Sequence, residues 1–330
     1  MRFLPYTQTT AVPNVIVDGA RNDQTVLTLS HWPKSGSPAE LEGDTSTAIV
    51  FNYLDSPRFH VEAEAVSNNH FDEDGLVGMF AMLQPSVAQR HRDLLVDVAQ
   101  AGDFGVFVRR QAARIAFVLS ACADPESSPL PSRLFTLPYA DLASELYIQL
   151  LDVLPRLLTN VDDYRTLWES EDAKLTASEK LFEQGLITIE ERHDLDLALV
   201  RLPEDLGRQR VHRFTQQRLA ECHPFALHNR TACTRLLLLQ GRHVELHYRY
   251  ESWVQLASRR PAPRVDLSDL ASELNREETT GGRWVFDGVD RITPRLHLEG
   301  SATTSVPLDA IVRRVEHHLR TGRSAWDPYD

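Results

Sequence analysis

The sequence predicts an α/β protein with a mostly parallel sheet in its N-terminal domain, a helical bridge and a smaller α+β C-terminal domain. Short β-branched segments alternate with amphipathic ones in the first third of the chain, a long helical stretch follows, and strand-like segments return after it. Alternating strands and helices are typical of parallel sheets. Since 330 residues exceed one ordinary domain, we expect a first domain over 1–138, a bridge over 139–187 and a second domain over 188–330.

Apolar runs bounded by turn residues define the elements of the first domain. We expect strands at 15–17, 25–29 and 61–66 and helices over 38–54 and from 76 to 83. The strand ending at Val66 runs into a polar turn and then an apolar helix. In α/β folds this strand–turn–helix junction is where functional residues gather.

The remaining elements follow from the same periodicities. Leu94 to Val96 is a short apolar run ending in Asp97, so it predicts a buried strand with a carboxylate at its tip. Leucines at helical spacing predict helices through most of 139–185. The other expected elements are helices over 109–123, 208–220, 267–275 and 308–319 and strands at 195–200, 234–239, 243–250 and 291–298.

Composition limits the classes of partner. The net charge is −12 with a pI near 5.5, and an acidic surface repels a phosphate backbone, so duplex nucleic acid is not expected as a partner. The three cysteines form no C-x-x-C pair, the first ten residues do not resemble a signal peptide, and the longest apolar run is too short to span a bilayer. We therefore expect a cytoplasmic protein without a membrane partner, and a homodimer stays open.

The acidic turn from His70 to Gly75 is the strongest candidate site. Asp72 and Asp74 lie two residues apart, and Gly75 lets the backbone bend sharply after them. Carboxylates held this close repel each other unless a proton or a cation lies between them. The turn predicts a site for Mn²⁺ or Mg²⁺, with His70 as a nitrogen ligand or catalytic residue. The alternative is a solvated loop in which one aspartate caps the following helix.

Three further residues extend this site. Asp97 would join the cation ligands if its predicted strand lies in the same parallel sheet, and Asp103 is an additional candidate ligand. His31 ends the strand over 25–29, so we expect it to face the same cleft as a ligand or a general acid. The alternative for His31 is a structural hydrogen bond to a local carbonyl group.

The second domain concentrates cations and glycines that suit a phosphate group. Arg249 and Arg264 are candidates to grip it, because a guanidinium group binds phosphate at two points. Gly281 and Gly282 are candidates to present backbone N–H groups, with Arg283 beside them. The alternative is that these arginines pair with nearby carboxylates at the surface.

The acidic turn, His70-Phe-Asp72-Glu-Asp74-Gly75, resembles the first motif of the DHH phosphoesterase superfamily. The segments around Arg264 and Gly281 resemble its DHHA1 substrate-binding domain. This resemblance implies a metal domain over 1–138, a substrate-binding domain over 188–330, bound manganese, and hydrolysis of a small phosphorylated molecule or short oligonucleotide at the cleft between the domains.

Two observations keep other interpretations open. The Asp-His-His tripeptide of the superfamily is absent, which favours a non-catalytic nucleotide- or phosphate-binding protein as the alternative. The segments 28–33 and 326–329 also resemble a domain family to which no activity is attached. A haloacid dehalogenase site fits less well, because the segment 67–70 ahead of the turn is polar rather than an apolar strand. An EF-hand loop fits less well, because Leu83 occupies its twelfth position.

Overall fold

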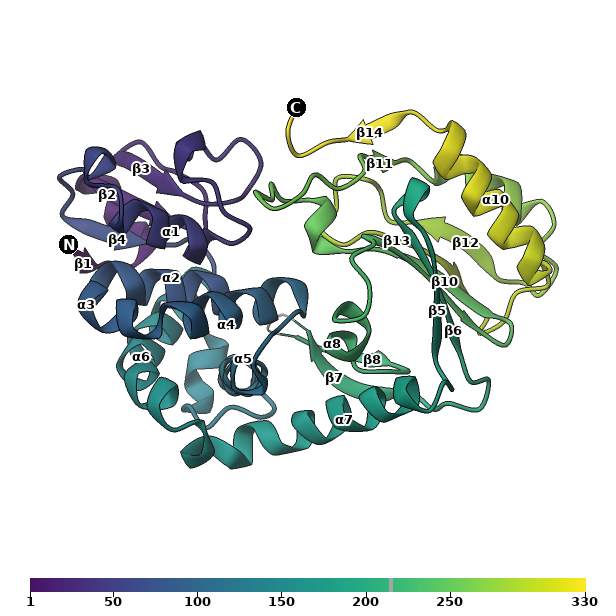
Figure 1. Ribbon diagram of the computed structural model, residues 1–330, viewed down its shortest axis with the longest axis horizontal. Coiled ribbons are helices and arrows are strands. Elements are labelled where there is room, and N and C mark those ends of the chain that lie inside the picture. Colours follow the sequence, from purple (N-terminus) through teal and green to yellow (C-terminus); the bar gives the residue numbers. More distant parts are fainter. Residues whose placement is uncertain (214–215) are drawn as a thin grey trace. The chain divides into compact units, whose positions relative to one another are not determined.

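The computed structural model describes residues 1–213 and 216–330, which form two compact units (Figure 1). Unit 1 comprises 1–176, 209–229 and 255–259, and unit 2 comprises 177–208, 230–254 and 260–330. The chain therefore passes between the units several times, which differs from the sequential division expected from sequence. In class, the fold is mixed α/β, with one parallel and one mixed sheet.

A four-stranded parallel sheet organises unit 1. Its strands, in spatial order, are β1 (Arg2–Phe3), β4 (Ala65–Ser67), β2 (Asn14–Val17) and β3 (Thr25–Leu29). Val15, Ile16 and Val17 of β2 have no exposed surface. A strand buried on both faces reads as a continuous apolar run, which is why sequence identified it.

Most of the regular secondary structure of unit 1 is helical. They are α1 (Ser46–Leu54), α2 (Glu73–Leu83), α3 (Pro85–Ala88), α4 (Arg92–Phe104), α5 (Arg110–Ala123), α6 (Tyr139–Thr159), the first part of α7 (Arg165–Glu183) and α8 (Pro224–His228). The hairpin β7 (Gln209–Arg213) and β8 (Gln216–Ala220) also belongs to this unit. The helix α2 contacts α1, α4 and the strands β2 and β4.

Unit 2 is built on a six-stranded mixed sheet. Its strands, in spatial order, are β12 (Arg283–Phe286), β13 (Arg295–Glu299), β10 (His243–Tyr248), β9 (Arg235–Gln240), β6 (Leu197–Leu202) and β5 (Thr188–Arg192). Only β6 and β9 run parallel among the described strands of this sheet. Two short strands, β11 (Arg264–Val265) and β14 (Ser324–Trp326), pair separately.

The core of unit 2 lies between its sheet and two helices, α9 (Ser268–Asn275) and α10 (Leu308–Thr321). Along β10, Val244, Leu246 and Tyr248 are buried in this core while the residues between them are half-buried. This alternation follows from the two-residue period of a strand. The unit therefore has a conventional hydrophobic core.

Several predicted elements are confirmed with shifted ends, and two are wrong. The helix predicted over 109–123 is α5, and the predicted strand at 61–66 contributes only β4. Leu94 to Asp97 is not a strand but part of α4, because Leu94, Leu95, Val98 and Ala99 place one apolar face at helical spacing. The described residues of the predicted helix over 208–220 form β7 and β8, while residues 214–215 lie outside the described residues.

Within the described residues, no helix has the length and apolar character needed to cross a bilayer. The long helix α6 contains Pro155 and carries its buried residues on one side, as an amphipathic helix of a packed domain does.

Candidate metal centre

Three strands of the unit 1 sheet deliver polar side chains to one edge. Asp18 follows β2 directly, His31 comes two residues after β3, and the acidic turn follows β4. Because these strands are parallel, their carboxyl ends meet at the same edge. The sheet topology therefore explains how residues distant in sequence form one cluster.

Asp18 occupies the centre of this cluster. It is 1% exposed, and its φ of 52° lies in the left-handed region, which aspartate tolerates better than most residues. Its Oδ1 accepts a hydrogen bond from the Ser46 hydroxyl at 2.7 Å. Its Oδ2 is buried without a well-formed hydrogen bond, and His70 Nε2 lies 3.3 Å from it. A buried carboxylate oxygen of this kind is costly unless a cation neutralises it.

His31 is oriented as an imidazole ligand would be. Its Nδ1 lies 2.7 Å from the carbonyl oxygen of Asp44, which places the proton on Nδ1 and directs Nε2 into the cluster. Nε2 is 3.4 Å from Asp103 Oδ2, 3.7 Å from Asp18 Oδ1 and 4.0 Å from Asp74 Oδ2. Burial lowers the pKa of His31, which favours the neutral ring that a metal ion requires.

His70 lies at the more exposed side of the cluster. Its Nε2 is 2.9 Å from Asp72 Oδ2, its side chain is 20% exposed, and the Trp32 ring stacks on it at 5.0 Å between centroids. Burial alone would lower the pKa of His70, but Asp72 and Asp18 outweigh it and raise this pKa well above its usual value. Without a cation, a protonated His70 therefore bridges these two carboxylates.

The two aspartates of the acidic turn also hold helix starts. Asp72 Oδ1 accepts the Gly75 N–H at 2.8 Å and so caps α2. The Asp74 carboxylate accepts the N–H groups of Ser46 at 2.7 Å and Thr47 at 2.8 Å, at the first turn of α1. Asp72 and Asp74 therefore hold helix starts and also belong to the candidate metal cluster, so the two alternatives predicted from sequence do not exclude each other.

Two sets of three ligand atoms share Asp18. Asp18, His70 and Asp72 form one set, and Asp18, His31 and Asp74 form the other, with the ligand atoms of each set within 4.8 Å of one another. Each set offers two carboxylates and one imidazole, which suits Mn²⁺ and, less well, Mg²⁺. The buried Asp18 Oδ2 supports this fit, because a cation would compensate the charge that the protein leaves there.

Burial and neighbouring charges shift the pKa values of the three aspartates of the cluster in different directions. Burial, and then the charges of Asp72 and Asp74, raise the pKa of Asp18 well above its ordinary value. Burial also raises the pKa of Asp74, whereas His70 outweighs burial at Asp72 and lowers its pKa. Carboxylates with raised pKa values in a shared site signal an excess of negative charge.

Of the six residues predicted for this cluster, the structure brings five together and separates one. His31, His70, Asp72, Asp74 and Asp103 lie in the cluster. Asp97 does not end a strand: it lies in α4, where its carboxylate accepts the N–H groups of Val108 at 2.7 Å and Arg109 at 2.8 Å and so holds the start of α5. Its assignment as a metal ligand is therefore corrected to a structural one.

Sequence analysis missed Asp18, which belongs to both ligand sets. In the sequence, Asp18-Gly19 indicates only a turn that bounds the strand over 15–17. The available signal was its position, because a carboxylate directly after a fully buried parallel strand is placed like the residues after β3 and β4.

The two arginines predicted to bind substrate are occupied by protein groups. Arg264 is fully buried, donates to Ser252 Oγ at 2.9 Å and to three backbone carbonyl groups, and has its pKa lowered to about 10 by burial. Arg249 is 4% exposed, pairs with Glu251 and donates to the Thr231 carbonyl at 2.7 Å. These partners correct both predictions, since guanidinium groups held in this way are part of the core of unit 2.

The predicted glycine loop lies at the surface of unit 2. Gly281 has a φ of 84° and Gly282 donates its N–H to Thr280 Oγ1 at 3.3 Å, just before β12. Arg283 opens β12 with an exposed side chain. Their role in binding a phosphate group stays a prediction.

Unit 1 contains a second buried charged cluster, formed by Asp124, Glu171, His212 and His223. His212 Nε2 lies 3.1 Å from Asp124 Oδ2, and Glu171 lies 3.6 Å from His212 Nδ1 and 3.2 Å from His223 Nε2. The histidine partners outweigh burial and lower the pKa of Glu171, while the pKa of His212 is raised against burial by Glu171 and Asp124. Burial lowers the pKa of His223, and Lys174 Nζ lies 2.9 Å from Glu171 Oε2. The positive charges of His212 and Lys174 therefore balance the two carboxylates, and the cluster fits a structural role.

Comparison with known proteins gives one positive result. A family of unknown function, DUF6687, matches residues 1–330. No curated protein and no solved structure gives a significant match.

Proposed function

We propose, for a chain that belongs to the family of unknown function DUF6687, a metal-dependent phosphoesterase activity at the Asp18 cluster. The cation would be Mn²⁺ or Mg²⁺, and the substrate a small phosphorylated compound or a short oligonucleotide. The observation that carries this proposal is the pair of three-residue ligand sets that share Asp18. A shared carboxylate flanked by two imidazoles suits a site for one or two cations.

In this proposal, some residues of the cluster bind the cation and another transfers a proton. A divalent cation, when bound, would lower the pKa of a coordinated water molecule and polarise a phosphoryl oxygen. Asp18, Asp74 and His31 are the deeper ligands, since all three are fully buried. His31 fits ligation better than proton transfer, because its Nδ1 is held by a carbonyl group and its ring has no access to solvent.

His70 has two exclusive roles open to it. Its single Nε2 faces Asp72 and Asp18, so it either binds a cation or carries the proton that a leaving group needs. Its partial exposure and raised pKa favour proton transfer in a site with one cation. Metal content of a His70→Gln variant separates the roles: a full complement with lost turnover indicates proton transfer, and a lost equivalent indicates ligation.

The choice of a phosphate ester rests on the sequence resemblance to DHH phosphoesterases. The His70-x-Asp72-x-Asp74-Gly75 turn carries that resemblance. The acidic composition favours a small or short substrate over a duplex, because a long phosphate backbone would be repelled.

The test combines metal analysis with turnover. Full-length protein purified without chelator is assayed for bound metal and for hydrolysis of bis-p-nitrophenyl phosphate and a dinucleotide with Mn²⁺. We expect Asp18→Asn and Asp74→Ala to lose bound metal and at least about 10³-fold in rate, because metal catalysis contributes several kcal/mol. Asp97→Asn is the matched control, since it also alters a buried aspartate of unit 1 and should keep both metal and rate. Equal rates for wild type and Asp18→Asn would overturn the proposal.

A non-catalytic nucleotide- or phosphate-binding protein is the second candidate. The absent Asp-His-His tripeptide favours it. Bound metal together with phosphate or nucleotide binding, but no hydrolysis of either substrate, would select this alternative.

A further inference from the structure

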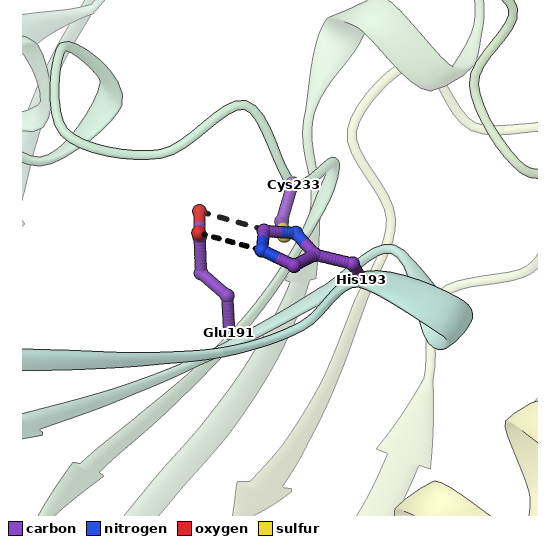
Figure 2. Close-up of side chains that lie close together, drawn as sticks. All are labelled: Glu191, His193 and Cys233. Carbon is purple, nitrogen blue, oxygen red and sulfur yellow. Dashed lines mark hydrogen bonds and ion pairs between the residues drawn. The ribbon is translucent and has the colours of Figure 1, made fainter.

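Another group of side chains able to bind a metal ion lies in unit 2 and shares no residue with the Asp18 cluster. Glu191 is on β5, His193 follows it in the 3-10 turn His193–Leu195, and Cys233 lies two residues before β9 (Figure 2). Their ligand atoms lie within 4.8 Å of one another. We propose that these three residues form a zinc site with one oxygen, one nitrogen and one sulfur ligand.

The sheet register explains why residues 40 positions apart meet. Arg192 at the end of β5 pairs with Leu197 at the start of β6, and Leu197 pairs with Arg235 at the start of β9. The end of β5 and the segment before β9 therefore flank the start of β6. A cation held there would join the two segments across the intervening strand.

The distances suit a tetrahedral zinc ion. Glu191 Oε2 is 3.4 Å from His193 Nε2, and Cys233 Sγ is 3.8 Å from Glu191 Oε1. With zinc bonds of about 2.0 Å to nitrogen or oxygen and about 2.3 Å to sulfur, the edges of a tetrahedron are about 3.3 Å and 3.5 Å. His193 and Cys233 approach different oxygens of the Glu191 carboxylate, so a small rotation of this group would let one oxygen face both partners at these values.

A hydrogen-bonded shell already orients two of the ligands. The Thr231 hydroxyl donates to Glu191 Oε1 at 2.5 Å and accepts the Cys233 N–H at 3.1 Å. Arg249 in turn donates to the Thr231 carbonyl at 2.7 Å. Partners of this kind fix ligand geometry in metal sites. The buried Arg249 therefore has a structural role in unit 2, which is to hold Thr231 beside the proposed ligands.

The mixed exposure of the ligands predicts an open coordination position. The His193 side chain is 80% exposed, while Cys233 is 4% exposed. Three protein ligands at a surface leave the fourth zinc position to water. A nucleophilic role for the cysteine fits less well, because burial, supported by Glu191 and Asp196, raises the pKa of the Cys233 thiol, whereas a reactive cysteine needs a lowered one.

Cobalt titration of the full-length protein tests this site independently of the Asp18 cluster, which contains no sulfur. Co²⁺ bound by a thiolate gives a sulfur-to-metal charge-transfer band, and Zn²⁺ should displace it. We expect one equivalent of this band in the wild type, none in Cys233→Ser, and at least about tenfold weaker binding in His193→Ala. His193→Ala keeps the test valid if Cys233→Ser fails to fold, since His193 is a surface residue.

The exposed His317 on α10 supplies the matched control, and His317→Ala should bind cobalt as the wild type does. Absence of the thiolate band from the wild type would overturn the site. So would a band that persists in Cys233→Ser or an unchanged affinity in His193→Ala. Hydrolysis of phosphate esters by Cys233→Ser should equal that of the wild type.

Discussion

The buried arginines of unit 2 and the Asp18 cluster of unit 1 hold charge in opposite ways. In unit 2, each donor group of Arg264 named above meets a carbonyl or hydroxyl oxygen, and Arg249 pairs with Glu251. In unit 1, the carboxylates of Asp18, Asp72 and Asp74 share one sheet edge with two histidines. The pKa values of Asp18 and Asp74 are raised even though the histidines lie beside them.

This difference distinguishes buried charges that stabilise the fold from buried charges that serve a function. A buried charge with matched partners is part of the fold, and removing one partner costs stability. A buried excess of one sign costs stability as it stands, so the fold tolerates it for another reason, and cation binding is the simplest. The following changes test whether this distinction holds.

Removing the Arg264 guanidinium group should give the largest effect on stability. Arg264→Met leaves four acceptors without their donor, so we expect a loss of about 3–5 kcal/mol in unfolding free energy, measured by denaturant titration. Arg283→Ala, at an exposed position of the same unit, should change it by less than about 0.5 kcal/mol. A stable Arg264→Met variant with weakened phosphate binding would instead make this arginine a ligand residue and break the comparison.

Adding a cation should stabilise unit 1 by a somewhat smaller amount. At a Mn²⁺ concentration of 100 times Kd, binding to the folded state alone contributes about 2.7 kcal/mol. Thermal unfolding with and without Mn²⁺ measures this gain. In Asp18→Asn the gain should disappear, because this variant alters both ligand sets. An equal gain in this variant would place the cation elsewhere.

Asp18→Asn should also stabilise the metal-free protein, by about 1 kcal/mol above neutral pH. The folded state raises the pKa of Asp18 above its ordinary value of 3.8. Its stabilising contribution is therefore complete below pH 3.8 and is lost as pH rises through the folded pKa. Asparagine does not titrate and still accepts from Ser46. Chemical unfolding of both proteins across pH, with chelator present, should show their difference growing as pH rises.

The balanced cluster around His212 should give the smallest effect. Because the folded state raises the pKa of His212, the contribution of this residue to stability is present below its ordinary pKa of 6.5 and is lost as pH rises through the folded pKa. We expect the Tm to fall by about 2 °C over that range. His212→Gln should flatten this decline without changing metal content. A steeper decline in the variant would mean that this cluster is not balanced.

Sequence predicted those parts of the fold whose periodicity is unambiguous. The buried strand over 15–17, the helix α5 and the helices α9 and α10 follow from apolar spacing that one structure alone satisfies. Leu94 to Val96 was assigned incorrectly because three consecutive apolar residues fit a strand and a helix equally well. Only the wider pattern, with Val98 and Ala99, places the run on a helix.

The candidate site was predicted where its ligands are close in sequence. His70, Asp72 and Asp74 share one turn, so their proximity needed no knowledge of topology. Asp18 could not be joined to them by sequence alone, because their meeting depends on β2 and β4 being parallel neighbours. Asp97 was included for a different reason. It was expected at the tip of a strand, but it lies in the helix α4.

The left-handed backbone of Asp18 has an evolutionary consequence. One base change converts an aspartate codon to asparagine or glycine, and both residues accept this conformation at least as readily. Such a substitution would also remove the repulsion between Asp18 and the carboxylates of Asp72 and Asp74. We therefore expect it to accumulate in any lineage that no longer needs the cation. The residue at this position among relatives would thus separate lineages that still select for metal binding from those that have abandoned it.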